Sequence, residues 1–127
     1  EPKDIYQACL EGVAYELRRN IGILKSMGMN PQKILATGGG SQNKKWLQIK
    51  ANLLGFPVTA MKNKDAGTIG TAIVVGTSIG LFSSLEEGME RLVQHGETYV
   101  PHLEAKKQYD ALYENYLKMV EGQKELK

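Results

Sequence analysis

The sequence contains few of the residues that mark specialised classes of protein. Its 127 residues include one cysteine, Cys9, so no internal disulfide can form and a disulfide-stapled secreted domain is disfavoured. No apolar run reaches the roughly 18 residues of a membrane-spanning helix. Charge is nearly balanced, with 16 Lys+Arg and 14 Asp+Glu. This balance excludes a strongly basic nucleic-acid-binding domain and an acidic disordered tail.

The remaining composition is that of one ordinary folded domain, with 42% apolar and 24% charged residues. At this length a chain can bury about two-thirds of its unfolded surface, which is enough for a real core. The chain opens with Glu1-Pro2-Lys3-Asp4, without an initiator Met or an apolar leader. We therefore expect it to be a piece of a longer chain.

The first segment predicts a long amphipathic helix over residues 4–28, with Asp4 as N-cap and Gly28 and Pro31 at its end. Its apolar residues recur in steps of a helical period. They are Ile5, Cys9, Val13, Leu17, Ile21 and Leu24. Cys9 lies on this line, so we expect a buried and inert thiol.

Two short apolar segments on either side of a helix predict a parallel strand–helix–strand unit. The strands cover residues 33–37 and 56–61, and the helix runs from about Asn43 to Leu54, where Gly55 is a stop signal. Strands joined through a helix are parallel, with a right-handed crossover. Trp46 is interpreted as an anchor of this helix to the sheet, with a place in a ligand site as the alternative.

The second half of the chain predicts three more helices and an extended segment. Residues 67–81 favour a tightly packed, buried helix, with a strand over 72–75 as the competing interpretation. Ser83 and Ser84 precede two acids, which indicates a helix running to about His95. Residues 96–101 are extended, and residues 104–120 form a final amphipathic helix. Its apolar side carries Tyr109, Leu112, Tyr113, Tyr116 and Val120.

The most informative stretch is the turn after the first strand, where Gly38, Gly39 and Gly40 lead into a helix. Without Cβ atoms a ligand can approach the backbone closely, and a helix N-terminus attracts anions. A phosphate or adenosine group fits such a turn, and Lys44 and Lys45 add positive charge. The alternative is a tight architectural turn without a ligand. From the glycines alone the two interpretations are equally favoured.

The common nucleotide motifs do not fit this turn. A phosphate-binding P-loop needs Gly-Lys followed by Ser or Thr, which the chain lacks. The dinucleotide fingerprint has glycines at its first, third and sixth positions, and here Asn43 takes the sixth. The acid expected at the end of the second strand is also missing from residues 58–61. A Rossmann dehydrogenase is therefore disfavoured.

The run GGGSQNKKWLQIKANLLGFPV, residues 38–58, resembles the second signature region of the FGGY carbohydrate kinases. The segments LEGVAYEL (residues 10–17), GTAIVVG (70–76) and GETYVP (96–101) resemble neighbouring parts of the same family. The resemblance covers nearly the whole chain. By pattern it is strongest to the xylulokinase-like and L-fuculokinase-like branches.

The resemblance implies an α/β fold over residues 1–127. This would be the C-terminal part of an actin-like ATPase (ribonuclease H-like) domain, with short parallel strands and packed helices. It implies a nucleotide-binding lobe of an ATP-dependent kinase that transfers the γ-phosphoryl to a hydroxyl of a xylulose-like or fuculose-like ketose or polyol. ATP and Mg²⁺ are the implied cofactors, with Mg²⁺ held mainly by the rest of the enzyme. The implied location is the cytoplasm, without nucleic-acid or membrane partners.

By resemblance, Gly39 and Gly40 would lie against the nucleotide, near adenosine and the α-phosphate, and Asn43 would hydrogen-bond the adenine. Gly38 and Ser41 would be neighbours of that site, and Asp65 would be structural. No position matches the family's catalytic Asp or its metal motifs, so we expect no catalytic residue and no metal ligand.

We therefore expect the chain alone to be inactive, and we expect surfaces left uncovered to favour a homodimer or higher species. His95 and His102 lack a His or Cys partner at metal-ligand spacing and are interpreted as surface residues. The alternative function is a non-catalytic α/β interaction module whose glycine turn is architectural only.

Overall fold

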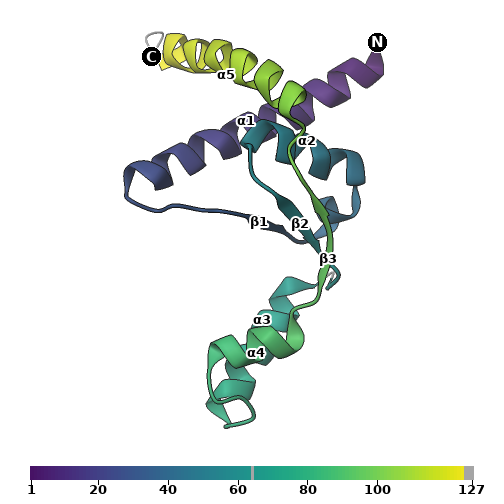
Figure 1. The fold of residues 1–127 in the computed structure, drawn as a ribbon, viewed down its shortest axis with the longest axis vertical. Coiled ribbons are helices and arrows are strands. Elements are labelled where there is room, and N and C mark those ends of the chain that lie inside the picture. The colour runs from purple at the N-terminus through teal and green to yellow at the C-terminus, as the bar shows by residue number, and fades with distance from the viewer. Residues whose placement is uncertain (64, 125–127) are drawn as a thin grey trace.

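The computed structural model describes residues 1–63 and 65–124, and within them the chain forms a small sheet with helices around it (Figure 1). The elements in chain order are α1 (Pro2–Ser26), β1 (Ile34–Ala36), the 3-10 helix η1 (Gly39–Gln42), α2 (Lys44–Leu54), β2 (Val58–Met61), α3 (Ala66–Ser78), α4 (Leu85–Leu92), β3 (His95–Tyr99) and α5 (Leu103–Lys124). In this described part no helix is both long enough and apolar enough to cross a bilayer.

The sheet has the order β1-β2-β3. Strands β1 and β2 are parallel, with Ile34 opposite Val58, which confirms the predicted strand–helix–strand unit. The extended segment after α4 is also confirmed. It pairs with β2 in the antiparallel sense, with an irregularity between Thr59 and Met61. The hydroxyls of Thr59 and Thr98 share a hydrogen bond of 2.8 Å across this pair.

Helix α2 contributes to two cores on its two sides. Toward the sheet, Leu47 and Ala51 pack with Ala36 and Val58, and all four are buried. Toward α1, a larger cluster forms from α1 and α2 residues. Its buried members are Ala14, Tyr15, Ile21, Trp46, Ile49, Leu53 and Leu54. Trp46 is therefore buried as an anchor of α2, and it holds this helix mainly against α1.

Helix α5 crosses α1 and closes the second core with tyrosines, as its predicted apolar side requires (Figure 1). The ring of Tyr15 stacks on Tyr113 and Tyr116, with centroids 6.0 Å and 5.2 Å apart, and meets Tyr109 edge-on at 6.4 Å. The Tyr109 hydroxyl donates to Glu11 at 2.9 Å. The hydrogen bond satisfies the polar end of this half-buried tyrosine, while its ring packs in the core.

The predicted buried line of α1 is wrong in part. Cys9 is exposed, so the expectation of a buried thiol is not met, and Ile5 and Val13 are 69% and 61% exposed. The buried side of α1 instead follows Leu10, Ala14, Leu17 and Ile21. Repeated steps of four exceed the 3.6 residues of a helical turn, so the predicted line moves around the helix away from the core. The helix also begins earlier than predicted. Glu1 is its N-cap. The side chain of Asp4, the third helical residue, accepts from the backbone nitrogen of Glu1 and completes a capping box.

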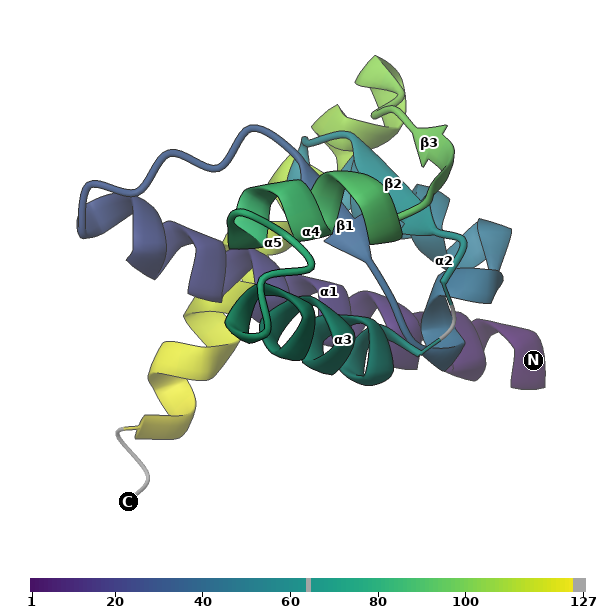
Figure 2. The same ribbon diagram turned by 90° about the horizontal axis from the view of Figure 1, so that it is seen from below.

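Residues 66–78 are helical, which corrects the strand alternative, but the predicted burial of this helix is wrong. Only Ile73 and Gly76 of α3 are buried, whereas Val74 and Ile79 are 58% and 72% exposed. The helix packs mainly on α4 in a hairpin that projects from the sheet (Figures 1 and 2). Helix α4 covers one side of this mainly apolar helix, and apolar side chains on the other sides stay exposed.

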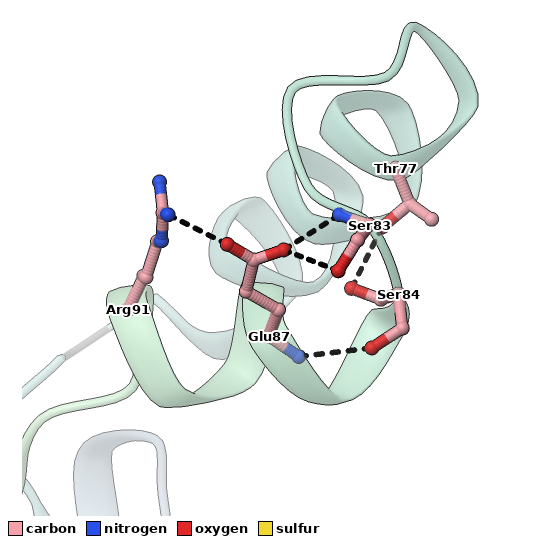
Figure 3. Close-up of polar contacts among 5 residues, drawn as sticks. All are labelled: Thr77, Ser83, Ser84, Glu87 and Arg91. Carbon is pink, nitrogen blue, oxygen red and sulfur yellow. Dashed lines mark hydrogen bonds and ion pairs between the residues drawn. The ribbon is translucent and has the colours of Figure 1, made fainter.

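The hairpin is held at its turn by Glu87, as Figure 3 shows. One carboxylate oxygen accepts from the backbone N–H and the hydroxyl of Ser83, both at 2.6 Å, and the other pairs with Arg91 at 2.6 Å. The Ser84 hydroxyl caps α4 by accepting from the Glu87 N–H at 3.2 Å. The predicted serine cap is confirmed. The helix ends at Leu92, and His95 opens β3 instead of ending the helix.

Gly76→Ala should destabilise the protein. A Cβ there would lie 2.5 Å from Cε2 of the buried Phe82 ring, so the hairpin would have to shift. Overpacking of this kind costs about 1–3 kcal/mol in the free energy of unfolding. Gly70→Ala in the same helix meets nothing within 4 Å and should instead stabilise by up to about 1 kcal/mol. Urea unfolding measures both, and equal effects of the two variants would contradict the packing.

Deprotonation of Tyr109 should lower the free energy of unfolding at alkaline pH. Burial, with the hydrogen bond to Glu11, raises the pKa of this hydroxyl well above its ordinary value. The folded state thus keeps the proton longer than the unfolded state, so the stabilisation is complete below about pH 10 and is lost as the pH rises further. Tyr109→Phe should flatten the decline in unfolding free energy above about pH 10. The control is Tyr6→Phe, at a residue 60% exposed, which should decline like the wild type.

Candidate functional site

The glycine turn begins where β1 ends, and it is fixed by one carbonyl oxygen. Gly38 has φ 79° and ψ −173°, a backbone conformation that L side chains avoid. Its carbonyl accepts from the Ser41 N–H at 3.0 Å and from the Ser41 hydroxyl at 2.7 Å. Ser41 itself is buried, with 4% of its surface exposed. These two bonds explain why glycine and serine occupy these positions, whether or not a ligand binds.

Asn43 links the turn to α2 as the N-cap of that helix. Its Oδ1 accepts from the N–H of Trp46 at 3.1 Å, which satisfies a backbone donor at the start of the helix. The NH₂ of the same amide makes no hydrogen bond within residues 1–63 and 65–124. The residue is exposed, so this NH₂ can donate to a group outside the chain.

Gly39 and Gly40 lie on the outer side of the turn and are exposed. A Cβ at Gly39 would meet nothing within 4 Å, whereas one at Gly40 would lie 3.4 Å from Nε1 of Trp46. The space beside Gly39 is therefore open to a ligand. At Gly40 the indole of Trp46 leaves little room for a side chain, so packing is part of the reason for glycine at this position.

Lys44, the first residue of α2, connects the turn to β3. Its Nζ lies 3.1 Å from Glu97, and the Tyr99 hydroxyl donates to the same carboxylate at 2.8 Å. The pKa of Glu97 is lowered, first by the hydrogen bond from Tyr99 and then by Lys44, and the pKa of Lys44 is raised by Glu97. These groups border a pocket of about 320 Å³ beside Ser41. The sequence analysis did not predict Glu97 and Tyr99 as site residues. The one available signal was that alternate residues of an extended segment lie on the same side.

The turn thus brings together every residue predicted for the nucleotide site: Gly38, Gly39, Gly40, Ser41 and Asn43. Asp65 lies elsewhere, as the N-cap of α3, with its Oδ1 accepting from the Thr68 N–H at 3.1 Å. Its expected structural role is confirmed. His95 and His102 are both exposed.

The described residues differ in how well they fit the two implied cofactors. The open space at Gly39, the helix N-terminus and the NH₂ of Asn43 fit a nucleotide. Residues 1–63 and 65–124 contain no group of three or more His, Cys, Asp or Glu that could hold a metal ion. We therefore assign no Mg²⁺ ligand to this part of the chain.

Comparison with known proteins gives the family. A family model described as the FGGY family of carbohydrate kinases, C-terminal domain, matches residues 1–79. The chain belongs to the FGGY family of carbohydrate kinases. The matched range contains α1, the strand–helix–strand unit and the glycine turn, and it includes every segment that carried the sequence resemblance except residues 96–101.

Relatives within this FGGY family carry several names. The chain is 31% identical over 121 residues to a human FGGY carbohydrate kinase domain-containing protein, covering 95% of this chain and 22% of that protein. It is 33% identical over 113 residues to the autoinducer-2 kinase of Yersinia pestis (strain Pestoides F), covering 88% and 21%.

The same family appears among the solved structures. The crystal structure of xylulose kinase from Rhodospirillum rubrum superposes with a TM-score of 0.83 at 27% identity, covering 96% of this chain and 25% of that one. The chain thus spans about a quarter of the length of the FGGY proteins it matches. The α/β fold is that of the corresponding part of these kinases.

Asn43→Ala should lower the free energy of unfolding by about 1 kcal/mol, because it removes the cap of α2. Asn43→Ser keeps an oxygen that can accept from the Trp46 N–H, so it should stay within about 0.5 kcal/mol of the wild type. Thermal or urea unfolding compares the two variants. If serine is as destabilising as alanine, the side-chain cap is not what holds the start of this helix.

Proposed function

We propose that this chain is the nucleotide-binding part of an ATP-dependent carbohydrate kinase. The observation that carries the proposal is the open backbone at Gly39, the first residue of η1, which leads directly into α2. An architectural turn alone needs the left-handed conformation of Gly38 and the hydroxyl of Ser41. It does not need an exposed glycine with free space where a side chain would be.

Three groups would hold the nucleotide. The backbone at Gly39 and Gly40 would let the adenosine and α-phosphate approach closely, with Gly38 and Ser41 shaping the turn beneath them. The first N–H groups of α2 would face negative charge, which the helix dipole favours. The amide NH₂ of Asn43 would donate to a ring nitrogen of adenine, in an orientation that its capping bond to Trp46 fixes.

ATP, when bound, supplies the phosphoryl group that passes to a hydroxyl of the sugar. Phosphoryl transfer depends mainly on positioning and on neutralising charge around the γ-phosphate. The glycine turn serves the first need by holding one end of the nucleotide. The described residues contain no cluster of metal ligands that could help to neutralise the charge around the γ-phosphate. We propose that the catalytic base and the metal ligands come from the rest of the kinase, and that the chain alone is inactive.

The sugar is proposed from the relatives. One relative is an autoinducer-2 kinase and a solved neighbour is a xylulose kinase. We propose a xylulose-like or fuculose-like ketose or polyol as the acceptor. The predicted self-association stays a prediction. It is supported by apolar side chains left exposed on α3 and α1, among them Val74, Ile79 and Ile5.

Gly39→Val should weaken nucleotide binding without unfolding the protein, because the new side chain enters open space where the nucleotide would lie. In the complete kinase we expect the KM for ATP to rise about tenfold or more, with the KM for the sugar changed less than about twofold. Gly70→Val is the matched control, since it also meets nothing within 4 Å but lies on α3. Asn43→Ser, which keeps a capping oxygen, should raise the KM for ATP more modestly.

Two results would contradict different parts of this proposal. An unchanged KM for ATP in folded Gly39→Val would remove the glycine turn from the nucleotide site, while leaving the kinase assignment in place. The absence of sugar-dependent ATP turnover in the complete protein, across ketoses and polyols, would overturn the kinase assignment. Nucleotide binding without turnover would then leave a binding module.

A further inference from the structure

A second candidate site lies at the C-terminal end of α2, opposite the glycine turn. A pocket of about 320 Å³ is bordered by Arg18 and Lys25 of α1, by Lys106 of α5 and by the backbone of Gly22 and Gly55. We propose that this pocket binds a phosphate group, either as the free anion or on a small phosphorylated molecule. The inference is independent of the kinase activity and of the nucleotide site.

The charges at this pocket suit a dianion. Three cationic side chains border it, and one carboxylate, Asp110, pairs with two of them from α5. Arg18 Nη1 lies 2.8 Å from Asp110 Oδ1, and Lys106 Nζ lies 2.6 Å from Asp110 Oδ2. Asp110 is not among the groups bordering the pocket. It holds two cations in place and leaves an excess of two positive charges, which matches a phosphate monoester above its second pKa of about 6.

The cations keep donors free for a ligand. Arg18 uses Nη1 for both Asp110 and the carbonyl of Leu53, at 3.1 Å, so within residues 1–63 and 65–124 its Nη2 and Nε have no hydrogen-bond partner. Over the same residues no carboxylate lies within ion-pair distance of Lys25, whose Nζ lies 4.8 Å above the ring of Phe56. A planar guanidinium and two ammonium groups are the donors that phosphate recognition commonly uses.

The need to cap the C-terminal end of α2 explains only one of these cations. The last carbonyls of a helix attract positive charge, and Arg18 does donate to Leu53 near the end of α2. Lys25 and Lys106 make no hydrogen bond to those carbonyls in the described part of the chain. Lys106 instead pairs with Asp110, and Lys25 lies over the ring of Phe56, so both ammonium groups border the pocket without binding the end of α2.

The backbone of the pocket leaves room for the ligand. A Cβ at Gly22 would meet nothing within 4 Å, so this turn of α1 leaves space beside the pocket. Gly55 has φ 72°, and a Cβ there would lie 2.7 Å from Cε of Lys106. Glycine at this position thus lets the lysine stem lie across the end of α2, which brings its ammonium to the pocket.

The test is a titration of the isotope-labelled protein with inorganic phosphate, compared with chloride at equal ionic strength and followed by amide chemical shifts. We expect saturable shifts at Gly22 and Gly55 with phosphate only. Lys25→Gln should weaken this binding by about fivefold, since it removes one charge-assisted donor. Lys106→Gln is the second pocket variant. Lys107→Gln is the matched control on α5, because Lys107 pairs with Glu104 and does not border the pocket.

Glycerol 3-phosphate in place of inorganic phosphate distinguishes the two sources of the anion. Tighter binding with additional shifts at Phe56 assigns a phosphorylated molecule, and equal affinity assigns free phosphate. Shifts that do not saturate, or that chloride reproduces, overturn the site. Equal losses in Lys25→Gln and Lys107→Gln overturn it as well, because general surface charge would then explain the binding. Gly39→Val should leave this titration unchanged.

Discussion

The packing of α2 on both of its sides is the constraint on which the rest of this structure depends. Leu47 and Ala51 bind it to the parallel strands, and Trp46, Ile49 and Leu53 bind it to α1. A helix buried on two sides cannot rotate or slide without opening a core. Its two ends are therefore fixed in space, and both candidate sites of the molecule lie at those ends.

At the N-terminal end of α2, the fixed position of the helix helps to hold the glycine turn in one conformation. The carbonyl of Gly38 is held by Ser41, and the Oδ1 of Asn43 is held by the start of α2, so the turn has little freedom left. What stays exposed is the backbone of Gly39 and the amide NH₂ of Asn43. A site that is ordered before its ligand arrives loses less entropy on binding, which is how a kinase can position ATP from a loop.

The sequence was most informative where the signals are local. The Asn43 cap, the Gly55 stop and the apolar runs around them predict the strand–helix–strand unit, and the structure confirms it. The predictions were wrong where burial depends on distant partners. Cys9 and Val13 are exposed because the core contacts the neighbouring face of α1, which carries Ala14, and Val74 is exposed because α3 packs mainly on α4. An apolar period shows which face could be buried, but not whether another element covers it.

The candidate sites also differ in whether their residues are close together or far apart in the sequence. Gly38, Gly39, Gly40, Ser41 and Asn43 are consecutive or nearly so, and a sequence motif is therefore enough to group them. The ion pair of Lys44 with Glu97 joins α2 to β3, and the pocket of Arg18, Lys25 and Lys106 joins α1 to α5. Residues that far apart in the chain carry no common pattern. Only the packing of the helices and strands brings them together.

The most direct test of the central claim, that the turn at the start of α2 binds the nucleotide, is a chemical-shift map of the labelled protein titrated with ADP and Mg²⁺. The account predicts that the largest shifts fall on the amides of Gly39, Gly40 and Lys44 and on the side-chain NH₂ of Asn43. It also predicts that the distal α3–α4 hairpin stays nearly unchanged. An unperturbed glycine turn at saturating ADP, with the shifts gathered elsewhere, would contradict it.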